Sequence, residues 1–425
     1  MKKTFNLIKK HLLCSYVILN ILFLLVTSFL YAYKISTYKI NSIAYIPALI
    51  INLIAIVIYI LNKRKNKEKL NISSYDIFLI IFFIFTLVSA ILSINTESAF
   101  FGFRGRYEGF FQITYYFSLF FLSSFLKKEE KKAIVYFILA LGVINCIHAH
   151  LQKFEIFHVP TIYDHNKPWA TGYVTNPNFF GTLMVLCLTS IIGLLIDSSE
   201  LNNQKKIIYF LLIGLFTSGL LISDTLSALV GLIITLVYVF IYAFKKDKEP
   251  LLIVVVLLIT TITLIESCFN QTSLVKDLIK TKDQSIEIVK GNAQDDFGTH
   301  RMYIWKETIK VVPNNLTYGV GVDNFYYAFG DKPLMSKRNT YYDKAHNEFL
   351  QILVCEGVYA LIFYILFIGN IIIRGIKNSF KNNELYLIIP AIAYLVQSLF
   401  NISVIEVAPL FYIYLGLNTF RKEKI

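Results

Sequence analysis

The sequence has little charge for a chain of its length. Only 16% of its 425 residues are Asp, Glu, Lys or Arg, whereas soluble domains contain about a quarter. Hydrophobic residues make up 56%, and apolar runs of about 17–25 residues recur along nearly the whole chain. Each run is long enough to cross about 30 Å of hydrocarbon, and in lipid it must be helical because its backbone amides find no water. The sequence therefore predicts an all-α polytopic membrane protein, with residues 1–425 forming a single integral membrane domain.

Several signatures of other protein classes are missing. The five cysteines are scattered, without a CxxC pair or a Cys/His cluster, which argues against a disulfide scaffold and a structural zinc site. Gly319-Val320-Gly321 is too short for a nucleotide-binding fingerprint and lacks the preceding strand. Asp295-Asp296 alone is weak support for a metal. No cofactor and no metal is predicted.

The apolar runs predict about twelve membrane spans. They lie at residues 12–33, 43–61, 76–94, 110–126, 133–152, 178–196, 207–223, 226–243, 251–266, 347–373, 385–403 and 405–420. The first run follows four lysines, but it is too long for the apolar part of a typical signal peptide, so we interpret it as a retained helix. The seventh and eighth spans form a tight hairpin.

The distribution of basic residues predicts the topology. With the N-terminus inside, the cytoplasmic segments hold 24 Lys and Arg and the short outer loops hold six. The segment 267–346 is a large extracytoplasmic loop with eleven more, but loops above about 60 residues escape the positive-inside rule. Both termini are thus predicted to be cytoplasmic. The net charge of +13 reflects topology and attraction to lipid headgroups rather than nucleic acid.

The unusual polar motifs all fall on the predicted outer side. One of them, "HRMYIWKETIKVV" in the long loop, predicts an amphipathic helix on the membrane surface. Its apolar stripe consists of Met302, Trp305, Ile309 and Val312. Pro313 should end this helix, and "YGVGVDNF" should form a glycine turn after it. If the protein performs chemistry, the sequence places it outside the cytoplasmic membrane.

The stretch "KAHNEFLQ" leads into the tenth span and holds the first candidate site. His346 could accept a proton near physiological pH. On the helix that follows, Glu348, Gln351, Cys355 and Glu356 share one face. Glu356 would lie about 15 Å below His346 at 1.5 Å per residue, so its carboxylate should face the bundle interior with a partner. The alternative is structural, with His346, Asn347 and Glu348 capping the helix and Glu356 making a purely structural hydrogen bond.

Three outer arginines are candidates for anion binding. Arg301, one turn before Trp305, presents paired donors that fit a phosphate or pyrophosphate. Arg104 and Arg106 lie in a short outer loop against the charge bias. The alternatives are a lipid-headgroup contact for Arg301 and a salt bridge to Glu108 for the other two.

The opening of the sixth span, "TNPNFFG", is interpreted as architectural. Asn178 can cap that helix and Gly181 allows close packing. Asp164, His165 and Asn166, which precede it, are polar enough to contact sugar.

Five segments together resemble one known family. They are "GRYEGFFQ", "GYVTNPNFFGTLMVL", "RMYIWKETIKVVPNNLTYGVGVDNF", "AHNEFLQILVCEGVYALIFY" and "AYLVQSLFNISVIEVAPLFYIYLGL". Their order and spacing over most of residues 75–420 resemble the O-antigen ligase and Wzy-type polymerase superfamily of bacterial surface-glycan assembly. The resemblance implies a GT-C-like fold and a metal-independent inverting glycosyltransferase in the cytoplasmic (inner) membrane, with its active site facing outside. The donor would be an undecaprenyl-pyrophosphate-linked glycan, and the acceptor a glycan, lipid or protein.

By motif, the resemblance places the catalytic histidine of the family at His346 and a pyrophosphate-binding arginine at Arg301. Arg104 and Arg106 are further candidates, because Leu226 stands where the family often has an arginine. Asn347, Glu348 and Gln351 would position the imidazole or contact sugar, and Glu356 would tie the tenth span to its neighbours. Two alternatives stay open. One is a twelve-span transporter of a lipid-linked or small anionic substrate, although internal halves and broken helices are not evident. The other is a non-catalytic glycan-lipid binder.

Overall fold

The structure is a computed structural model, and it describes residues 11–67, 71–156, 170–198, 202–270, 297–335 and 340–419. In these residues the chain is helical, with a single isolated β-bridge between Met335 and Tyr341. The helices are α2 (Leu12–Ala32), α3 (Tyr38–Lys65), α4 (Ser74–Ile91), α5 (Thr96–Phe101), α6 (Phe110–Ser124), α7 (Lys128–Lys153), α8 (Pro177–Asp197), α9 (Asn203–Ile222), α10 (Leu226–Lys245), α11 (Glu249–Asn270), α13 (Phe297–Val311), η1 (Val312–Asn315), η2 (Phe325–Phe329), α14 (Glu348–Asn382), α15 (Leu385–Ser398) and α16 (Ala408–Leu417).

Every predicted span contains a helix, and nine helices of the described residues are long and apolar enough to cross a membrane. This confirms an all-α polytopic membrane protein. The helices α6, α15 and α16 are shorter than a span requires, so the count of twelve spans stays a prediction.

The last two spans were predicted too long. α15 ends at Ser398 and α16 begins at Ala408, and the non-helical connection between them is mostly buried. Irregular backbone is tolerated in a membrane protein where it is buried in protein. This connection contributes Ile402 and Ser403 to a cavity described below.

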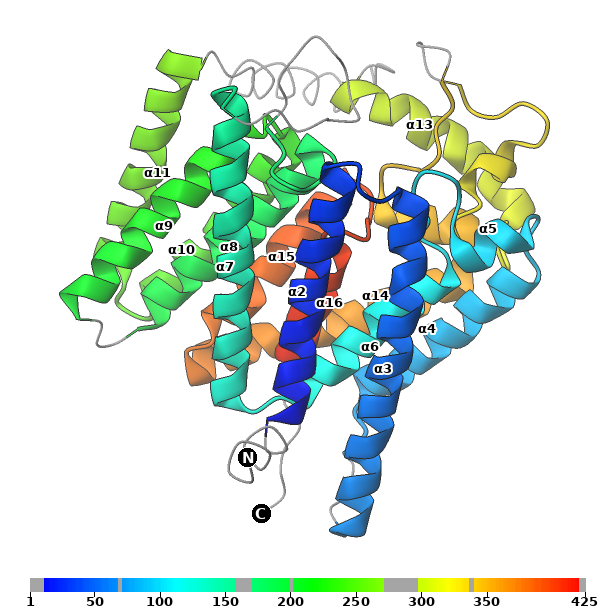
Figure 1. Ribbon diagram of the computed structural model, residues 1–425, viewed down its shortest axis with the longest axis horizontal. Coiled ribbons are helices and arrows are strands. Elements are labelled where there is room, and N and C mark those ends of the chain that lie inside the picture. Colours follow the sequence, from blue (N-terminus) through cyan, green and yellow to red (C-terminus); the bar gives the residue numbers. More distant parts are fainter. Residues whose placement is uncertain are drawn as a thin grey trace.

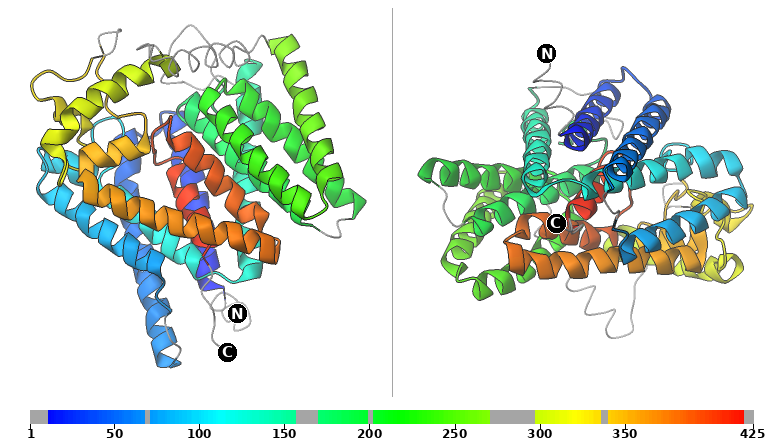
Figure 2. Two further views of the ribbon diagram at one scale, coloured as in Figure 1. Left: turned by 180° about the vertical axis from the view of Figure 1, so that it is seen from behind. Right: turned by 90° about the horizontal axis from the view of Figure 1, so that it is seen from below.

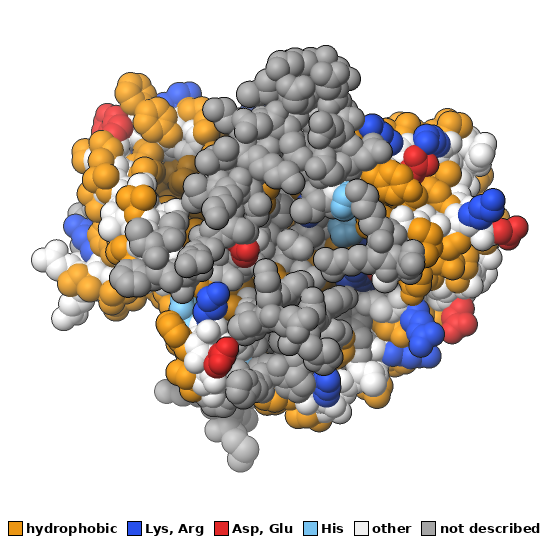
Figure 3. Space-filling model, turned by 90° about the horizontal axis from the view of Figure 1, so that it is seen from above, with side chains coloured by type: hydrophobic (Ala, Val, Ile, Leu, Met, Phe, Trp, Pro, Cys, Tyr) orange, Lys and Arg blue, Asp and Glu red, His pale blue; other side chains and the backbone are white. Residues whose placement is uncertain are grey.

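Helix α8 lies at the centre of the bundle and is buried along almost its whole length. It packs against α15 and α9, while α16 packs against α6. α4 and the long part of α14 run side by side, slantwise to α2 and α16 (Figures 1 and 2). α2 begins and α16 ends on the lower side of Figure 1, whereas α5 and α13 lie on the upper side. That upper side shows scattered Lys and Arg side chains among broad hydrophobic areas (Figure 3).

The N-cap residue of α8 was predicted two positions too late in the sequence. Asn176, not Asn178, is the N-cap residue, and its side-chain oxygen accepts the backbone N–H of Asn178 at 2.8 Å. Pro177 occupies the first helical position, where its fixed φ suits the helix and its missing N–H is not needed. Gly181 allows the predicted close packing, because a Cβ there would lie 2.9 Å from the Ser223 Oγ.

The structure confirms a helix over the segment that was predicted to be amphipathic, but the predicted apolar stripe holds only in part. α13 ends at Val311, directly before the 3₁₀ turn that contains Pro313. Its buried positions are Ile304 and Thr308, whereas Ile309 is 59% exposed. The inner face packs on the first turns of α14 through a small cluster that includes Val320 and Val354. Trp305 and Val312 of the stripe pack against this cluster. Thr308 can take a buried position although it is polar, because its hydroxyl donates to the Ile304 carbonyl, which a hydropathy pattern cannot reveal.

Candidate active site on the outer side of the helix bundle

The tenth span is a broken helix. Gly357 adopts φ 87° and ψ 175°, which divides α14 into a short segment from Glu348 to Glu356 and a long segment from Val358 onward. The absence of broken helices was therefore predicted wrongly, whereas the depth of Glu356 in the membrane stays a prediction, because the break lies after this residue. The sequence shows only a single glycine in an apolar run, which is ambiguous.

Loop backbone satisfies the groups that the break leaves open. The Val320 and Gly321 N–H groups donate to the Val354 and Cys355 carbonyls at 3.1 and 2.9 Å. On the other side of the break, the Val358 N–H donates to the Leu316 carbonyl at 2.8 Å. The predicted glycine turn and the residues before it thus seal the broken helix, which here means that they satisfy its open backbone groups by hydrogen bonds.

Two glycines make this contact possible. A Cβ on Gly357 would lie 2.2 Å from the Thr317 carbonyl oxygen, and a Cβ on Gly319 would lie 2.1 Å from the Cys355 carbonyl carbon. Both residues also have positive φ, a conformation that side chains disfavour. The short segment of α14 is therefore fixed to the outer loop by backbone contacts as well as by the side-chain cluster that includes Val320 and Val354.

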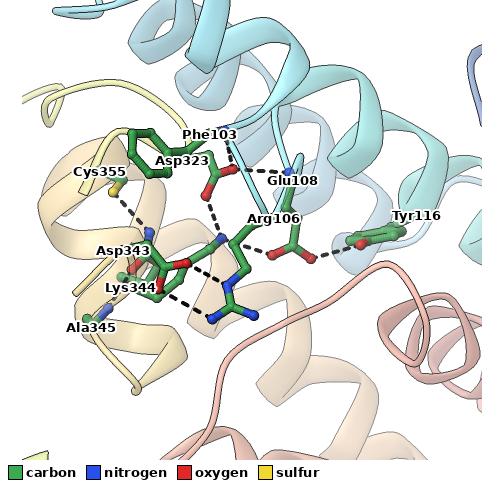
Figure 4. A network of polar contacts seen from close by, with 10 residues as sticks. Phe103, Arg106, Glu108, Tyr116, Asp323, Asp343, Lys344, Ala345 and Cys355 are labelled. Carbon is green, nitrogen blue, oxygen red and sulfur yellow. Dashed lines mark hydrogen bonds and ion pairs between the residues drawn. The ribbon is translucent and has the colours of Figure 1, made fainter. Parts of the chain in front are cut away.

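Beside this segment lies a buried ionic network centred on Lys344 (Figure 4). The Lys344 Nζ lies 2.7 Å from Asp323 Oδ1 and 3.0 Å from Glu108 Oε2, and all three residues are at most 4% exposed. Glu108 also accepts the Tyr116 hydroxyl at 2.8 Å. Burial alone would lower the pKa of Lys344, but the two carboxylates outweigh burial and hold that pKa above its ordinary value. Lys344 thus stays charged and ties together three parts of the chain.

The second oxygen of Asp323 holds the loop of residues 102–109, which we call the 102–109 loop. Asp323 Oδ2 accepts the backbone N–H groups of Phe103 at 2.7 Å and Glu108 at 3.0 Å. A carboxylate with two N–H donors and an ammonium partner has its hydrogen-bonding capacity well used. The network therefore fixes this loop to the turn that precedes α14.

His346 sits in that turn and is held from both sides. Gln351 Oε1 accepts the N–H of Ala345 at 2.8 Å, and Asn347 caps α14 by accepting the Leu350 N–H at 3.0 Å. His346 itself has φ 50°, a left-handed conformation that is uncommon outside glycine. The structure places Asn347 and Gln351 as the groups that fix the backbone on either side of the imidazole.

The surroundings of His346 favour its neutral form. Burial lowers the pKa of His346 well below its ordinary 6.5, and the charge of Arg301 lowers it further. Asp343 acts in the opposite direction, while Arg106 and Lys344 add to the lowering. The imidazole is therefore unprotonated at neutral pH and can accept a proton.

Arg106 and Arg301 both act on His346, although they come from distant parts of the sequence. Arg106 pairs with Asp343, with its Nε 2.6 Å from Oδ2. The alternative of a salt bridge between Arg106 and Glu108 is therefore wrong, because Glu108 pairs with Lys344. Burial lowers the pKa of Arg301 to about 10, which leaves its guanidinium charged at neutral pH.

Arg104 lies apart from this group. Its side chain is exposed and lines a different cavity, together with residues of α3 and α5. The alternative of a salt bridge between Arg104 and Glu108 is not found, and Glu108 pairs with Lys344 instead. The two arginines that flank Gly105 thus lie in different environments, Arg104 at the other cavity and Arg106 beside Asp343.

A small cavity of about 40 Å³ lies between the Lys344 network and α14. Its polar lining includes Glu108, Asp323, Lys344, Glu348, Gln351 and Glu356. Glu356 is 5% exposed and accepts the Thr86 hydroxyl of α4 at 2.5 Å, so this buried carboxylate has the partner that it requires. The cavity has room for water, and it holds more carboxylates than cations.

Sequence reasoning missed part of this site. Lys344, Asp343 and Asp323 were not selected as site residues, although Lys344 opens the stretch "KAHNEFLQ" and Asp343 directly precedes it. A signal was available in the density of polar residues in "YDKAHNE", but their pairing with Arg106 and Glu108 depends on the fold. Leu226 is the first residue of α10. Asp164, His165, Asn166 and the Asp295-Asp296 pair lie outside the described residues.

Comparison with known proteins adds an independent observation. Residues 209–365 match the sequence model of the O-antigen ligase family. The match runs from α9 into α14 and so contains Arg301, Lys344 and His346, but neither Arg104 nor Arg106. No curated protein matched the chain. This match supports membership of the O-antigen ligase family, and it covers the third and fourth of the five segments on which the resemblance rests.

Proposed function

We propose that the protein is a metal-independent, inverting glycosyltransferase that moves a glycan from an undecaprenyl-pyrophosphate carrier to an acceptor. The O-antigen ligase match supports a role in the assembly of cell-surface glycans at the membrane. Within that family the chain acts either as a ligase or as a Wzy-like polymerase. Both termini are cytoplasmic and the site faces outside, as the distribution of Lys and Arg predicts.

The environment of His346 is the observation that carries this proposal. A neutral imidazole lies in a turn fixed by Asn347 and Gln351, with Arg301 and Arg106 close enough to lower its pKa. A base beside two guanidinium groups suits a reaction in which a hydroxyl loses its proton while a phosphorylated group leaves. Chemistry on such an activated donor depends mainly on positioning and electrostatics.

In the proposed step, the acceptor hydroxyl oxygen attacks the anomeric carbon of the donor glycan. The bond between that carbon and the pyrophosphate oxygen breaks, and its electron pair leaves with the carrier pyrophosphate. The hydroxyl proton passes to His346. Attack from the side opposite the leaving group inverts the anomeric configuration. Arg301 and Arg106 neutralise the charge of the leaving group.

Donor binding should also improve His346 as a base. Arg301 and Arg106 both lower the pKa of His346, and a bound pyrophosphate would offset their charge. The pKa of His346 should therefore rise toward neutrality in the donor complex, where a general base is most effective. The free enzyme would hold a weaker base and become competent only with the substrate present.

The remaining candidate residues have supporting roles in this proposal. Asn347 and Gln351 hold the backbone beside His346. Glu348 lines the small cavity at the start of α14 and is placed to contact a sugar hydroxyl. Glu356 ties α14 to α4 through Thr86.

The broken helix does not favour the transporter alternative. In transporters, discontinuous helices leave backbone groups open to bind substrate or ions. Here the Val354 and Cys355 carbonyls and the Val358 N–H are taken by loop backbone. The break serves to anchor the turn that carries His346.

The test is the size of the surface glycan, measured by gel, in cells that carry His346→Ala. Tagged protein confirms membrane insertion. His11→Ala is the control, because it removes an imidazole that pairs with Glu130 at the other end of the bundle. Removal of a general base should slow transfer about 10²–10⁴-fold, so the glycan profile should collapse in His346→Ala alone.

Two patterns of accumulation separate the two family functions. Carrier-linked single repeat units without polymer indicate a polymerase. Long carrier-linked chains that never reach their acceptor indicate a ligase. An unchanged profile at normal protein levels would refute the role of His346 and favour the non-catalytic binder.

A further inference from the structure

A second, much larger cavity lies on the other side of the 102–109 loop. Its volume is about 690 Å³, which is within the range of about 300–1,000 Å³ typical of ligand sites. The first turns of α3, helix α5, the 102–109 loop and the start of α6 form its walls. Gln112 lines this large cavity, whereas Glu108 and Tyr116 of the same region line the small one. The start of α6 therefore separates the two cavities.

Besides Ile43 and Ile46, the lining combines aromatic, neutral polar and charged side chains. Aromatic walls come from Tyr45, Phe100, Phe101, Tyr107, Phe111 and Tyr327. Neutral polar groups come from Ser42, Asn95, Ser98 and Gln112. The charged residues are Lys39, Glu97 and Arg104, all exposed. No ion pair of Arg104 is found in the described part of the chain.

Gln112 points to a missing ligand. It is only 4% exposed, and its Nε2 has no hydrogen-bond partner among the described residues. An unpaired buried amide group destabilises the fold, so its presence calls for an explanation. A ligand oxygen in the large cavity would supply the missing acceptor.

The chemistry of the lining selects the ligand class. A site for a lipid tail would not need the amide, hydroxyl and charged groups, and a site for an inorganic anion would not need aromatic walls. A sugar ring matches both, because its C–H faces stack on the negative faces of aromatic rings while its hydroxyls pair with polar groups. Two cations against one carboxylate favour an acidic substituent on that sugar.

We infer that the large cavity binds a saccharide segment with an acidic substituent, which Arg104 contacts. This inference deepens the proposed function, on which it rests for the origin of the saccharide. Its position supports that link. The 102–109 loop supplies Arg104 to the large cavity and, two residues on, Arg106 to the His346 site. A glycan held in the large cavity would thus lie next to the site of transfer.

The test measures glycan binding directly. Full-length protein is purified in phosphatidylethanolamine–phosphatidylglycerol nanodiscs. The probe is the host's own surface polysaccharide, released by mild acid, reduced to one or a few repeats and labelled with a fluorophore. Fluorescence polarisation gives the Kd for wild type, Arg104→Gln, Gln112→Leu and Ser98→Trp. Lys332→Gln removes an exposed cation outside the cavity and serves as the control.

We expect each cavity variant to weaken binding. Loss of the charged contact in Arg104→Gln should raise Kd about tenfold. Gln112→Leu keeps the volume and should raise Kd several-fold, and Ser98→Trp, which fills the cavity, should raise it more than tenfold. The Kd of Lys332→Gln should equal that of wild type. If wild type binds neither the lipid-free probe nor the carrier-linked glycan, or if the cavity variants bind them as wild type does, the inference is refuted.

Two further measurements complete the test. The first shows whether the saccharide belongs to the donor or to the growing or accepting chain, and the second distinguishes failure of this inference from failure of the proposed function. Carrier-linked glycan from His346→Ala cells is compared with the lipid-free probe. If only the carrier-linked form binds with the same sensitivity, the cavity holds the donor glycan, and if both bind, it holds the growing or accepting chain. His346→Ala itself should bind the probe normally. Transfer retained by His346→Ala, together with weakened binding by Arg104→Gln, would reject the catalytic proposal and keep the binding site.

Discussion

The two cavities beside the 102–109 loop are built on opposite principles. In the small one, a buried lysine pairs with two carboxylates at 2.7 and 3.0 Å, two backbone N–H groups donate to Asp323, and the Tyr116 hydroxyl donates to Glu108. In the large one, an arginine, a lysine and a glutamate are exposed, and a buried amide group lacks a partner. The small cavity is organised before any ligand arrives, whereas the large one leaves its exposed charged groups and the Gln112 amide group available.

This difference indicates a division of labour. Reacting groups must be held within a narrow range of geometry, and a rigid surrounding network achieves this. Recognition of a polymer segment instead needs area and adaptable contacts. A single loop connects the two, so substitutions of neighbouring residues on it should have different consequences.

The largest effect should come from removing the central cation of the small cavity. Lys344→Met leaves Glu108 and Asp323 as buried carboxylates without a counter-charge, which should destabilise the fold by about 3–5 kcal/mol and abolish transfer. Thermal unfolding in detergent measures the loss.

Two comparisons show whether the lost charge of Lys344 causes the loss of stability. Lys332→Met, an exposed lysine in the same outer loop, should change stability by less than about 0.5 kcal/mol. The triple variant Lys344→Met, Glu108→Gln, Asp323→Asn should regain much of the lost stability. Equal unfolding temperatures for Lys344→Met and wild type would show that the ionic network does not stabilise the fold.

The backbone seal of α14 should give the next largest effect. In Gly357→Ala the new Cβ meets the Thr317 carbonyl and the residue keeps a positive φ, which should cost about 1–3 kcal/mol and misplace the turn that holds His346. Gly369 in the long segment of the same helix has no atom within 4 Å of a Cβ. Gly369→Ala should therefore be neutral or stabilise by about 0.5–1 kcal/mol. If both variants unfold alike, the break at Gly357 is not required.

How much of this could be predicted from the sequence depends on how local each signal is. The helices follow from apolar runs that the bilayer forces to be helical, and His346 and Arg301 stand out as single residues. Lys344 could not be selected, because a lysine is almost never fully buried unless it is paired, and its partners Glu108 and Asp323 are remote in sequence. The seal between Gly319 and Gly357 is likewise a contact between two segments, and no pattern within either segment reveals it.

Substitutions of the two neighbouring arginines, Arg104 and Arg106, should have smaller effects that differ between the two cavities. Arg106→Gln removes a cation that lowers the pKa of His346, so that pKa should rise and the acid limb of the kcat/KM profile should move to higher pH. Transfer should also slow about tenfold, because one charge-assisted contact to the leaving group is lost.

Arg104→Gln is the matched comparison. Its effect should fall on the KM for the glycan, with the acid limb in the position of wild type, since Arg104 does not act on His346. In wild type that limb should lie below the ordinary imidazole pKa of about 6.5, because the pKa of His346 is lowered in the free enzyme and the base stays unprotonated on mild acidification. Identical pH profiles for wild type and Arg106→Gln would place Arg106 outside the catalytic group.

The smallest effect concerns Trp305, which lies on the inner side of α13 with Arg301. Its ring lies 6.1 Å from that of Phe400, and its buried Nε1–H has no hydrogen-bond partner among the described residues. Trp305→Phe keeps an aromatic ring and removes the unsatisfied donor, so stability should change by less than about 0.5 kcal/mol because the lost packing is offset by the removed desolvation penalty. Transfer should stay within twofold of wild type, measured beside the unfolding temperature. A large loss of transfer at unchanged stability would instead show that the indole N–H, like the amide of Gln112, binds a ligand. The contrast between the two cavities would then be weaker, because the catalytic side would also hold a polar group that is available for a ligand.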